Sequence, residues 1–209
     1  MFTGIVEELG HVVSREGSRI VVRCPIAASD AAIGGSISID GVCLTVVGVD
    51  GDEASFDISP ETFDRTSLGG LAPDDRVNVE RPATLVSRLG GHLVQGHVDG
   101  VAFATAVQPD AEGGARLSVC LPGDLLRYVV EKGSITLDGV SLTVAAIDGE
   151  EIDLALIPHT LAVTTFGAIR PGDPLNVEVD VVAKYVARNI ESLIGDGVAV
   201  ESGGKERTA

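Results

Sequence analysis

The chain has 209 residues, of which 44% are hydrophobic, and its formal net charge at neutral pH is −16. This charge argues against a nucleic-acid-binding protein, because affinity for a polyanion comes mainly from Lys and Arg at the phosphates. The sequence holds no apolar run of the roughly 20 residues that a membrane-spanning helix needs, and its start lacks the basic flank and apolar stretch of a secretory signal. We therefore expect a cytoplasmic, globular protein that binds neither nucleic acid nor a membrane.

Short β-type runs follow one another along the chain, separated by turn signals. In the first half, alternating or β-branched patterns predict strands at residues 20–23, 36–39, 44–49, 54–58 and 76–80. Asp-Gly turns at residues 50–52 and 148–150 predict tight hairpins. About six short strands in each half indicate a small closed barrel, because closure removes the unpaired edges that a flat sheet exposes.

Two stretches are predicted to be helical. One covers residues 122–130 and has a weaker counterpart at residues 25–32. The other, residues 181–194, places four apolar side chains on one stripe at helical spacing: Val182, Val186, Ile190 and Leu193. This stripe either packs on its own barrel or mediates self-association, and the sequence leaves both alternatives open. Residues 196–209 are polar, which is typical of a disordered tail.

The two halves of the chain are copies of one folding unit. Residues 35–46 return as residues 133–144, displaced by 98 positions, and this constant register indicates duplication. The starts of the halves align with a displacement of 92 instead, which predicts six extra residues in a surface loop at residues 108–115. We therefore expect an N-terminal domain at residues 1–89, a C-terminal domain at residues 90–180 and a helix at residues 181–195.

The copies differ most in polar character at two matched positions, Cys43 against Ser141 and Glu61 against His159. A thiol in one copy and a hydroxyl in the other would make two similar pockets unequal, although a buried, inert Cys is the commoner fate of a lone thiol. The three Cys are scattered without paired spacing, so we predict neither a metal site nor a disulfide framework.

The Gly-rich segment at residues 90–99 carries two of the four His. Of these, His97 is a candidate for catalysis or ligand contact, and a hydrogen-bonded structural role is the alternative. Asp40 and Asp138 each precede Gly in the repeated loop, and the simplest role for both is to bond turn amides. The sequence has no phosphate loop, dinucleotide fingerprint or nucleophile elbow.

Together these segments resemble the riboflavin synthase family of the alpha-chain type. The resemblance rests on the first seven residues, the duplicated Asp-Gly-Val-Cys/Ser-Leu-Thr-Val motif, the segment Gly91 to Val98, and Ile157-Pro158-His159-Thr160. These segments occur in order over residues 1 to about 195. Their combination is specific, although no single motif is decisive.

The resemblance implies an all-β fold, with two tandem six-stranded antiparallel Greek-key barrels and a C-terminal α-helix through which three chains form a homotrimer. It also implies a reaction without cofactor or metal. Two molecules of 6,7-dimethyl-8-ribityllumazine dismutate to riboflavin and 5-amino-6-(D-ribitylamino)uracil. In this family each barrel binds one lumazine, and the active site forms where the N-terminal barrel of one subunit meets the C-terminal barrel of another. Association with a lumazine synthase stays open.

The family pattern, carried onto this sequence, implies two substrate pockets. The N-terminal pocket comprises Gly4, Ile5, Val6, Cys43, Leu44, Thr45, Asp57, Ile58, Ser59, Pro60, Glu61 and Thr62. The C-terminal pocket comprises Gly96, His97, Val98, Lys132, Ser141, Leu142, Thr143, Ile157, Pro158, His159, Thr160, Leu161 and Ala162. The expected catalytic set is His97, Ser141 and Asp138, with Cys43 and Phe2 on the opposing barrel; His97 is expected to move a proton.

Two other functions compete with catalysis. The first is a non-catalytic lumazine or flavin carrier of the same fold, similar to the antenna proteins of luminous bacteria. The second is a β-barrel interaction module that binds no lumazine. Both repeated loops retain Asp, and the second half retains His97, Lys132 and Ser141, which favours the enzyme.

Overall fold

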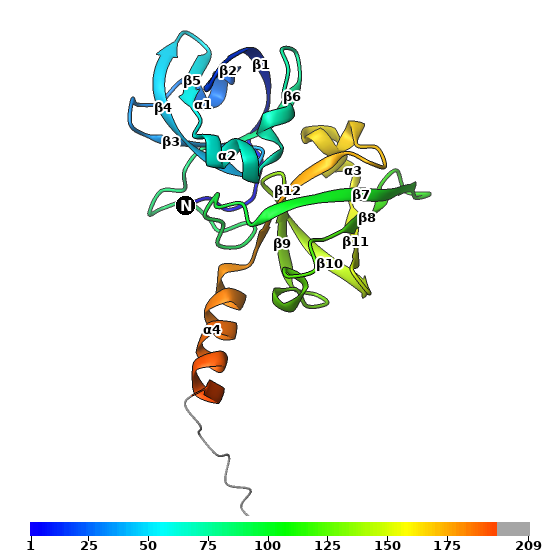
Figure 1. Ribbon diagram of the computed structural model, residues 1–209. Helices are drawn as coiled ribbons and strands as arrows, with labels where there is room; N and C mark the ends of the chain where they lie inside the picture. Colours follow the sequence, from blue (N-terminus) through cyan, green and yellow to red (C-terminus); the bar gives the residue numbers. More distant parts are fainter. Residues whose placement is uncertain (196–209) are drawn as a thin grey trace, which may run out of the picture.

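The protein folds into two β-barrels that lie side by side, with a helix extending from the second (Figure 1). This computed structural model describes residues 1–195, so the predicted tail lies outside the described residues. Each barrel is closed, antiparallel and six-stranded. The all-β, two-barrel fold predicted from the sequence is therefore confirmed.

The first barrel contains β1 to β6 in the order β1-β2-β5-β4-β3-β6. Its strands are β1 (Glu8–Glu16), β2 (Arg19–Arg23), β3 (Ser36–Ile39), β4 (Val42–Asp50), β5 (Glu53–Asp57) and β6 (Arg76–Glu80). All five strands predicted in this half are present, and β1 was missed. The alternation of apolar residues that marks a strand is interrupted in β1, because one inward position is Gly10. A Cβ at this position would approach Val79 to 2.8 Å.

The second barrel contains β7 to β12 in the order β10-β11-β8-β7-β12-β9. Its strands are β7 (Gly100–Pro109), β8 (Ala115–Cys120), β9 (Ser134–Leu137), β10 (Val140–Asp148), β11 (Glu151–Leu156) and β12 (Pro174–Val179). Residues 110–114 connect β7 to β8, where the first barrel uses only Gly17 and Ser18 between β1 and β2. This loop therefore holds three of the six predicted extra residues, and β7 and β8 are each one residue longer than β1 and β2.

Each barrel closes around its own apolar core. The first core centres on Ile20, Ile37, Ile39 and Phe56, and the second on Leu117, Ile135, Leu137, Ile152 and Leu154. Each of these side chains is at most 1% exposed, and each stabilises the fold by roughly 1.5–3 kcal/mol relative to an exposed position. The two cores are separate clusters.

The short helices lie at the barrel ends. They are α1 (Pro25–Ala28), α2 (Pro60–Arg65), α3 (Pro158–Val163) and the 3-10 turns η1 (Ser67–Gly70), η2 (Leu126–Tyr128) and η3 (Thr165–Ala168). The helix predicted at residues 122–130 was wrong, because only the single turn η2 forms there. The helices α2 and α3 were missed because six residues are too few to show an apolar stripe. The signal for α2 was the cap, since Ser59 Oγ accepts the N–H of Thr62 and Pro60 follows at the first helical position. The helix α3 has no side-chain cap, and its signal was Pro158 at the first helical position.

The helix α4 (Val181–Gly195) confirms the predicted C-terminal helix and extends away from both barrels (Figure 1). The N-terminal turn of α4 is held by an ion pair between Lys184 Nζ and Asp99 Oδ1 at 2.7 Å. The apolar stripe stays uncovered, with each member between 50% and 59% exposed: Val182, Val186, Ile190 and Leu193. The stripe therefore does not pack on its own barrel. At 15 residues, α4 is too short to cross a membrane. Within residues 1–195, no helix is both long enough and apolar enough to do so.

Candidate functional site

Two short segments cross from one barrel to the other. The first strap, residues 3–6, precedes β1 of the first barrel, and the second strap, residues 95–98, precedes β7 of the second. The carbonyl of Gly4 accepts the N–H of Ser141 at 2.7 Å, whereas the carbonyl of Gly96 accepts the N–H of Cys43 at 2.9 Å. Each strap therefore lies on the repeated loop of the other barrel.

Apolar packing agrees with this exchange. Val6 of the first strap packs against the core of the second barrel, and Val98 of the second strap packs against the core of the first. Gly4 and Gly96 have φ of +75° and +78°, and a Cβ on either would lie 2.6 Å from the Cβ of Ser141 or Cys43. Only glycine fits this close approach. The predicted grouping of the straps is therefore wrong, because each site takes its strap from the other half.

Apart from the straps, the residues predicted for each pocket lie close together in the barrel to which the sequence analysis assigned them. Because β4 pairs antiparallel with β5, the start of β4 lies beside the end of β5 and the helix α2 that follows. The same pairing places the start of β10 beside the end of β11 and α3. We name the resulting surfaces by their distinctive residue, the Cys43 site and the Ser141 site.

The Cys43 site comprises Cys43, Leu44, Thr45, Asp57, Ile58, Ser59, Pro60, Glu61, Thr62, Gly96, His97 and Val98. The Ser141 site comprises Gly4, Ile5, Val6, Ser141, Leu142, Thr143, Ile157, Pro158, His159, Thr160, Leu161 and Ala162. Both surfaces are open, since Thr45, Glu61, Thr143 and His159 are all exposed. Lys132 is also exposed, and its N–H bonds to Val144, three residues along β10 from Ser141.

The imidazole that contacts Ser141 belongs to His92. Ser141 Oγ lies 2.8 Å from His92 Nδ1, and Thr136 Oγ1 lies 3.2 Å from His92 Nε2. A neutral ring with its proton on Nε2 satisfies both contacts, because Nδ1 then accepts the hydroxyl of Ser141. Burial lowers the pKa of His92, against an opposing effect of Asp180, and so favours the neutral ring over the charged one.

The sequence prediction assigned the proton-transfer role to His97 and missed His92. His97 lies on the second strap, next to Gly96 and therefore beside Cys43. Its backbone N–H donates to Glu178 Oε2 at 3.0 Å, and its side chain is exposed. The structure therefore associates one His with each site: His92 with the Ser141 site and His97 with the Cys43 site.

Asp138 and its counterpart Asp40 lie where the barrels meet. Asp40 Oδ1 accepts the N–H of Asn78, and Asp138 Oδ1 accepts the N–H of Asn176, both at 2.7 Å. These amides belong to the last strand of each barrel, so the expected bond to a turn amide is replaced by one to a strand. The Asn side chains then cross over: Asn78 Nδ2 donates to the carbonyl of Asp138, and Asn176 Nδ2 to that of Asp40.

The two carboxyl groups sit in an environment that disfavours charge. Burial raises the pKa of Asp40 to about 7, opposed by its bond to Asn78. Burial, together with the charge of Asp40, raises the pKa of Asp138 well above its usual range. The Asp138 carboxyl group bonds Asn176 on β12 of its own barrel, and it is the backbone carbonyl of Asp138 that accepts a bond from the other barrel, through Asn78.

Phe2 is part of the core and not of a proton-transfer set. Its side chain is 1% exposed, and its backbone forms an antiparallel bridge with Val94. The N–H of Phe2 donates to Val94 at 2.6 Å, and the N–H of Val94 donates back at 3.1 Å. Phe2 thus anchors the chain just before the first strap and next to the second.

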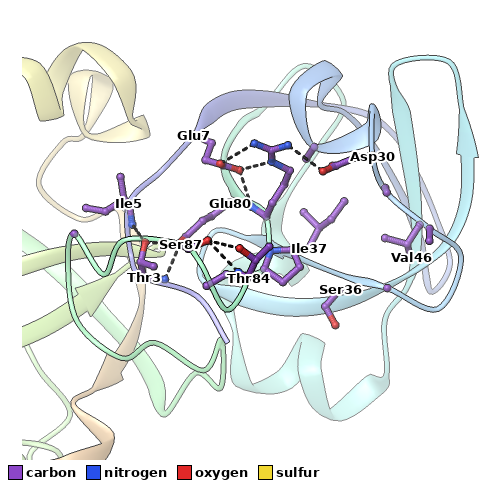
Figure 2. A pocket seen from close by; sticks show the side chains of 18 of the residues that line it. Thr3, Ile5, Glu7, Asp30, Ser36, Ile37, Val46, Glu80, Thr84 and Ser87 are labelled. Atoms are coloured by element: carbon purple, nitrogen blue, oxygen red, sulfur yellow. Dashed lines mark hydrogen bonds and ion pairs between the residues drawn. The ribbon is translucent and has the colours of Figure 1, made fainter.

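Two cavities of about 630 Å³ lie beside these sites. The first adjoins the first strap and includes Thr3, Ile5, Glu7 and Glu80, with Asp30 on its far side (Figure 2). Of its lining residues, only Ile5 was predicted to bind substrate. The second lies between the barrels and is lined by Asp40 and Asp138 and by Leu161 and Ala162 of α3.

Metal ligands do not gather within residues 1–195, where no three His, Cys, Asp or Glu side chains are grouped to hold an ion. All three Cys are free thiols. Cys24 is fully buried, and burial raises its pKa to about 11, which makes its thiol inert. Cys43 is half-buried at its site, so of these two thiols only Cys43 is within reach of a ligand.

Comparison with known proteins identifies the repeated unit. The lumazine binding domain family matches residues 3–82 and again residues 95–180. The riboflavin synthase of Mycobacterium tuberculosis is 49% identical over 200 residues, which cover 92% of this chain and 99% of the relative. The riboflavin synthase of Bacillus subtilis is 36% identical over 192 residues, covering 90% and 89% of the two chains.

Solved structures of LumP share the fold of this chain. LumP complexed with riboflavin superposes with a TM-score of 0.77 at 28% identity, covering 86% of this chain and 99% of LumP. LumP complexed with 6,7-dimethyl-8-(1'-D-ribityl) lumazine superposes with a TM-score of 0.76 at 25% identity and the same coverage. The repeated match, the identity over nearly the whole chain and the paired barrels all lead to one conclusion: the chain belongs to the riboflavin synthase family.

Proposed function

We propose that the chain catalyses the dismutation of two 6,7-dimethyl-8-ribityllumazine molecules to riboflavin and 5-amino-6-(D-ribitylamino)uracil. The observation that carries this proposal is the pair of sites, each built from a strap, a strand start and a short helix. Two copies of one surface suit a reaction that consumes two copies of one substrate. Family membership supplies the identity of that substrate.

In this reaction the protein has little covalent chemistry to perform. Loss of a proton from the C7 methyl group of one lumazine leaves a charge that the electron-poor ring delocalises. The protein has to orient two planar molecules, so proximity supplies most of the rate enhancement. The straps offer backbone groups to the ring edge, and open strand positions such as Thr45 and Thr143 offer hydroxyls to the ribityl chain.

The proton-transfer groups differ between the sites, which gives the two substrates unequal roles. The Ser141 site has a hydroxyl paired with the neutral imidazole of His92, an arrangement that can accept a proton or activate a nucleophile. The Cys43 site has a thiol and the exposed ring of His97. Glu61 and His159 occupy matched places on α2 and α3, where they would contact the two substrates differently.

A homotrimer follows from the same proposal. Both sites are open surfaces, and the apolar stripe of α4 is half exposed over four residues from Val182 to Leu193. Burying such a stripe in a helix bundle would place the barrels of neighbouring chains close to one another. An open site of one chain would then be completed by a barrel of the next. A lumazine synthase partner remains a prediction of the family resemblance.

Turnover distinguishes the enzyme from the carrier, which is the second candidate because LumP, a structural neighbour, is complexed with flavins and the lumazine. When the purified chain is mixed with the lumazine, we expect flavin absorbance to appear, with one riboflavin formed for every two lumazines consumed. Binding of the lumazine without flavin formation would instead identify a carrier. Failure to bind the lumazine would leave only the interaction module.

The proposed trimer depends on the stripe of α4. Replacing Val186 and Ile190 together with Asp is expected to yield monomers and to lower turnover, because charged side chains cannot be buried in an apolar bundle. Light scattering gives the mass, and flavin absorbance gives the activity. Arg188→Asp, on the opposite face and 83% exposed, is the matched control and should remain trimeric. A trimeric double variant would show that another surface holds the chains together.

A further inference from the structure

Glu178 binds three of the four residues of the second strap. It lies on β12 of the second barrel, is 2% exposed, and accepts three successive backbone N–H groups. Its Oε1 accepts from Gln95 at 2.7 Å, and its Oε2 accepts from Gly96 at 2.9 Å and from His97 at 3.0 Å. One carboxylate thus fixes the segment that carries His97 and covers Cys43.

Glu80 does the same for the first strap. It lies on β6 of the first barrel, 98 positions before Glu178, and is 5% exposed. Its Oε1 accepts the N–H of Thr3 at 2.6 Å and the hydroxyl of Thr3 at 2.7 Å, and its Oε2 accepts the N–H of Gly4 at 3.0 Å (Figure 2). The duplication has therefore kept one carboxylate for each strap.

These bonds account for two buried carboxylates that the proposed chemistry does not use. Burial raises the pKa of both carboxyl groups, and the strap amides are the main groups that oppose the rise. Charge-assisted bonds of this kind are roughly twice as strong as neutral ones. The straps and the carboxylates therefore stabilise each other, and a strap that lost its carboxylate would leave several amides unpaired.

We propose that Glu80 and Glu178 are positioning residues that act across the barrels: each holds, from its own barrel, the strap that completes the site on the other. Glu178 of the second barrel thus organises the Cys43 site, and Glu80 of the first barrel organises the Ser141 site. The inference rests on the proposed function, because it concerns the same two sites. Its distinctive consequence is that a change in one barrel disturbs the site on its neighbour.

The alkylation rate of Cys43 tests this consequence without requiring turnover. In the intact oligomer, Glu178→Gln keeps the shape of the side chain but turns an amide N–H toward at least one strap N–H. We expect iodoacetamide to label Cys43 about tenfold faster, which corresponds to the loss of one bond to a charged acceptor. Peptide mass spectrometry locates the label. Cys120, on β8 and away from both straps, and the buried Cys24 should be labelled at the parent's rates.

Glu80→Gln is the matched control, because it makes the same change at the first strap. Cys43 labelling in this variant should stay within twofold of the parent, although Cys43 and Glu80 belong to the same barrel. Equal labelling of Cys43 in the two variants would overturn the crossed assignment. Faster labelling of Cys24 in Glu178→Gln would show that this variant unfolds. Glu178→Asp, which keeps the charge on a shorter side chain, would then take its place. Glu178→Asp must speed the labelling of Cys43 and leave that of Cys24 unchanged, or the crossed assignment is wrong.

Steady-state kinetics separates this inference from the proposed function. In an active parent, Glu178→Gln and Glu80→Gln should each lower kcat by at least tenfold, because misplaced straps misalign the bound pair. Glu178→Asp should recover part of the loss. An inactive parent would contradict the proposed function and leave the labelling test intact. An active parent whose Gln variants keep full kcat would contradict the inference alone.

Discussion

Replacing His92 with Ala is expected to lower kcat about a hundredfold, the usual loss when a proton-transfer partner is removed. The reason is that His92 Nδ1 lies 2.8 Å from Ser141 Oγ and fixes the direction of that hydroxyl. KM should change much less, because His92 is 8% exposed and does not itself face the ligand surface. Stopped-flow measurement of flavin formation gives kcat and KM separately.

The Asn variant of His92 provides the control. The side-chain amide of Asn reaches the position of Nδ1 and can still bond Ser141, but it does not reach Thr136. We therefore expect His92→Asn to retain more activity than His92→Ala, and Ser141→Ala to lose as much as His92→Ala. If the double variant is no slower than either single variant, the two residues act as one unit. Parental kcat in His92→Ala would exclude the pair from the mechanism.

Much of the fold was predictable because the duplicated sequence repeats each strand signal. A short run such as residues 36–39 is ambiguous alone, but its return at 134–137 with the same turn residues defines a strand and its place in the barrel. The region around residues 122–130 misled the prediction, because its apolar residues resemble a helical pattern. In the structure Leu125 and Val129 are buried in the second core, and the chain between them makes only the turn η2.

The crossing of the straps could not be predicted from the repeat. Gly4 matches Gly96 and Cys43 matches Ser141, and this correspondence is the same whether each strap lies on its own barrel or on the other. Only tertiary contacts distinguish these two arrangements. His92 was missed for a related reason, because it lies ahead of the second copy and has no counterpart in the first. Its role depends on an approach to Ser141 over 49 positions of sequence.

The contact between Gly41 and Gly139 is expected to tolerate substitution poorly. These residues follow Asp40 and Asp138 in the repeated loops, and their backbones touch where the barrels meet. A Cβ on Gly41 would lie 2.6 Å from the backbone nitrogen of Gly139, and one on Gly139 would lie 2.8 Å from that of Gly41. Backbone atoms cannot rotate away as a side chain does, so one loop has to move.

Gly41→Ala should therefore lower the free energy of unfolding through two separate effects. Adopting a φ of +78° costs Ala roughly 1–2 kcal/mol, and displacing the Gly139 backbone adds roughly 1–3 kcal/mol, as in an overpacked core. Gly51→Ala is the control: Gly51 lies in the turn after β4 with φ of +60° and open space around it, so this variant incurs only the first cost. Urea unfolding at one pH measures the difference between the two variants.

Activity should separate the two variants further. Gly41 lies two residues before Cys43, and Gly139 two residues before Ser141, so a displaced contact shifts both reactive side chains relative to each other. Gly51→Ala should keep the parent's kcat, whereas Gly41→Ala should lose most of it even where the protein remains folded. Equal stability and activity in the two variants would mean that the barrels can slide apart without consequence. The crossed straps and the crossed Asn bonds, which span the same junction, argue that they cannot.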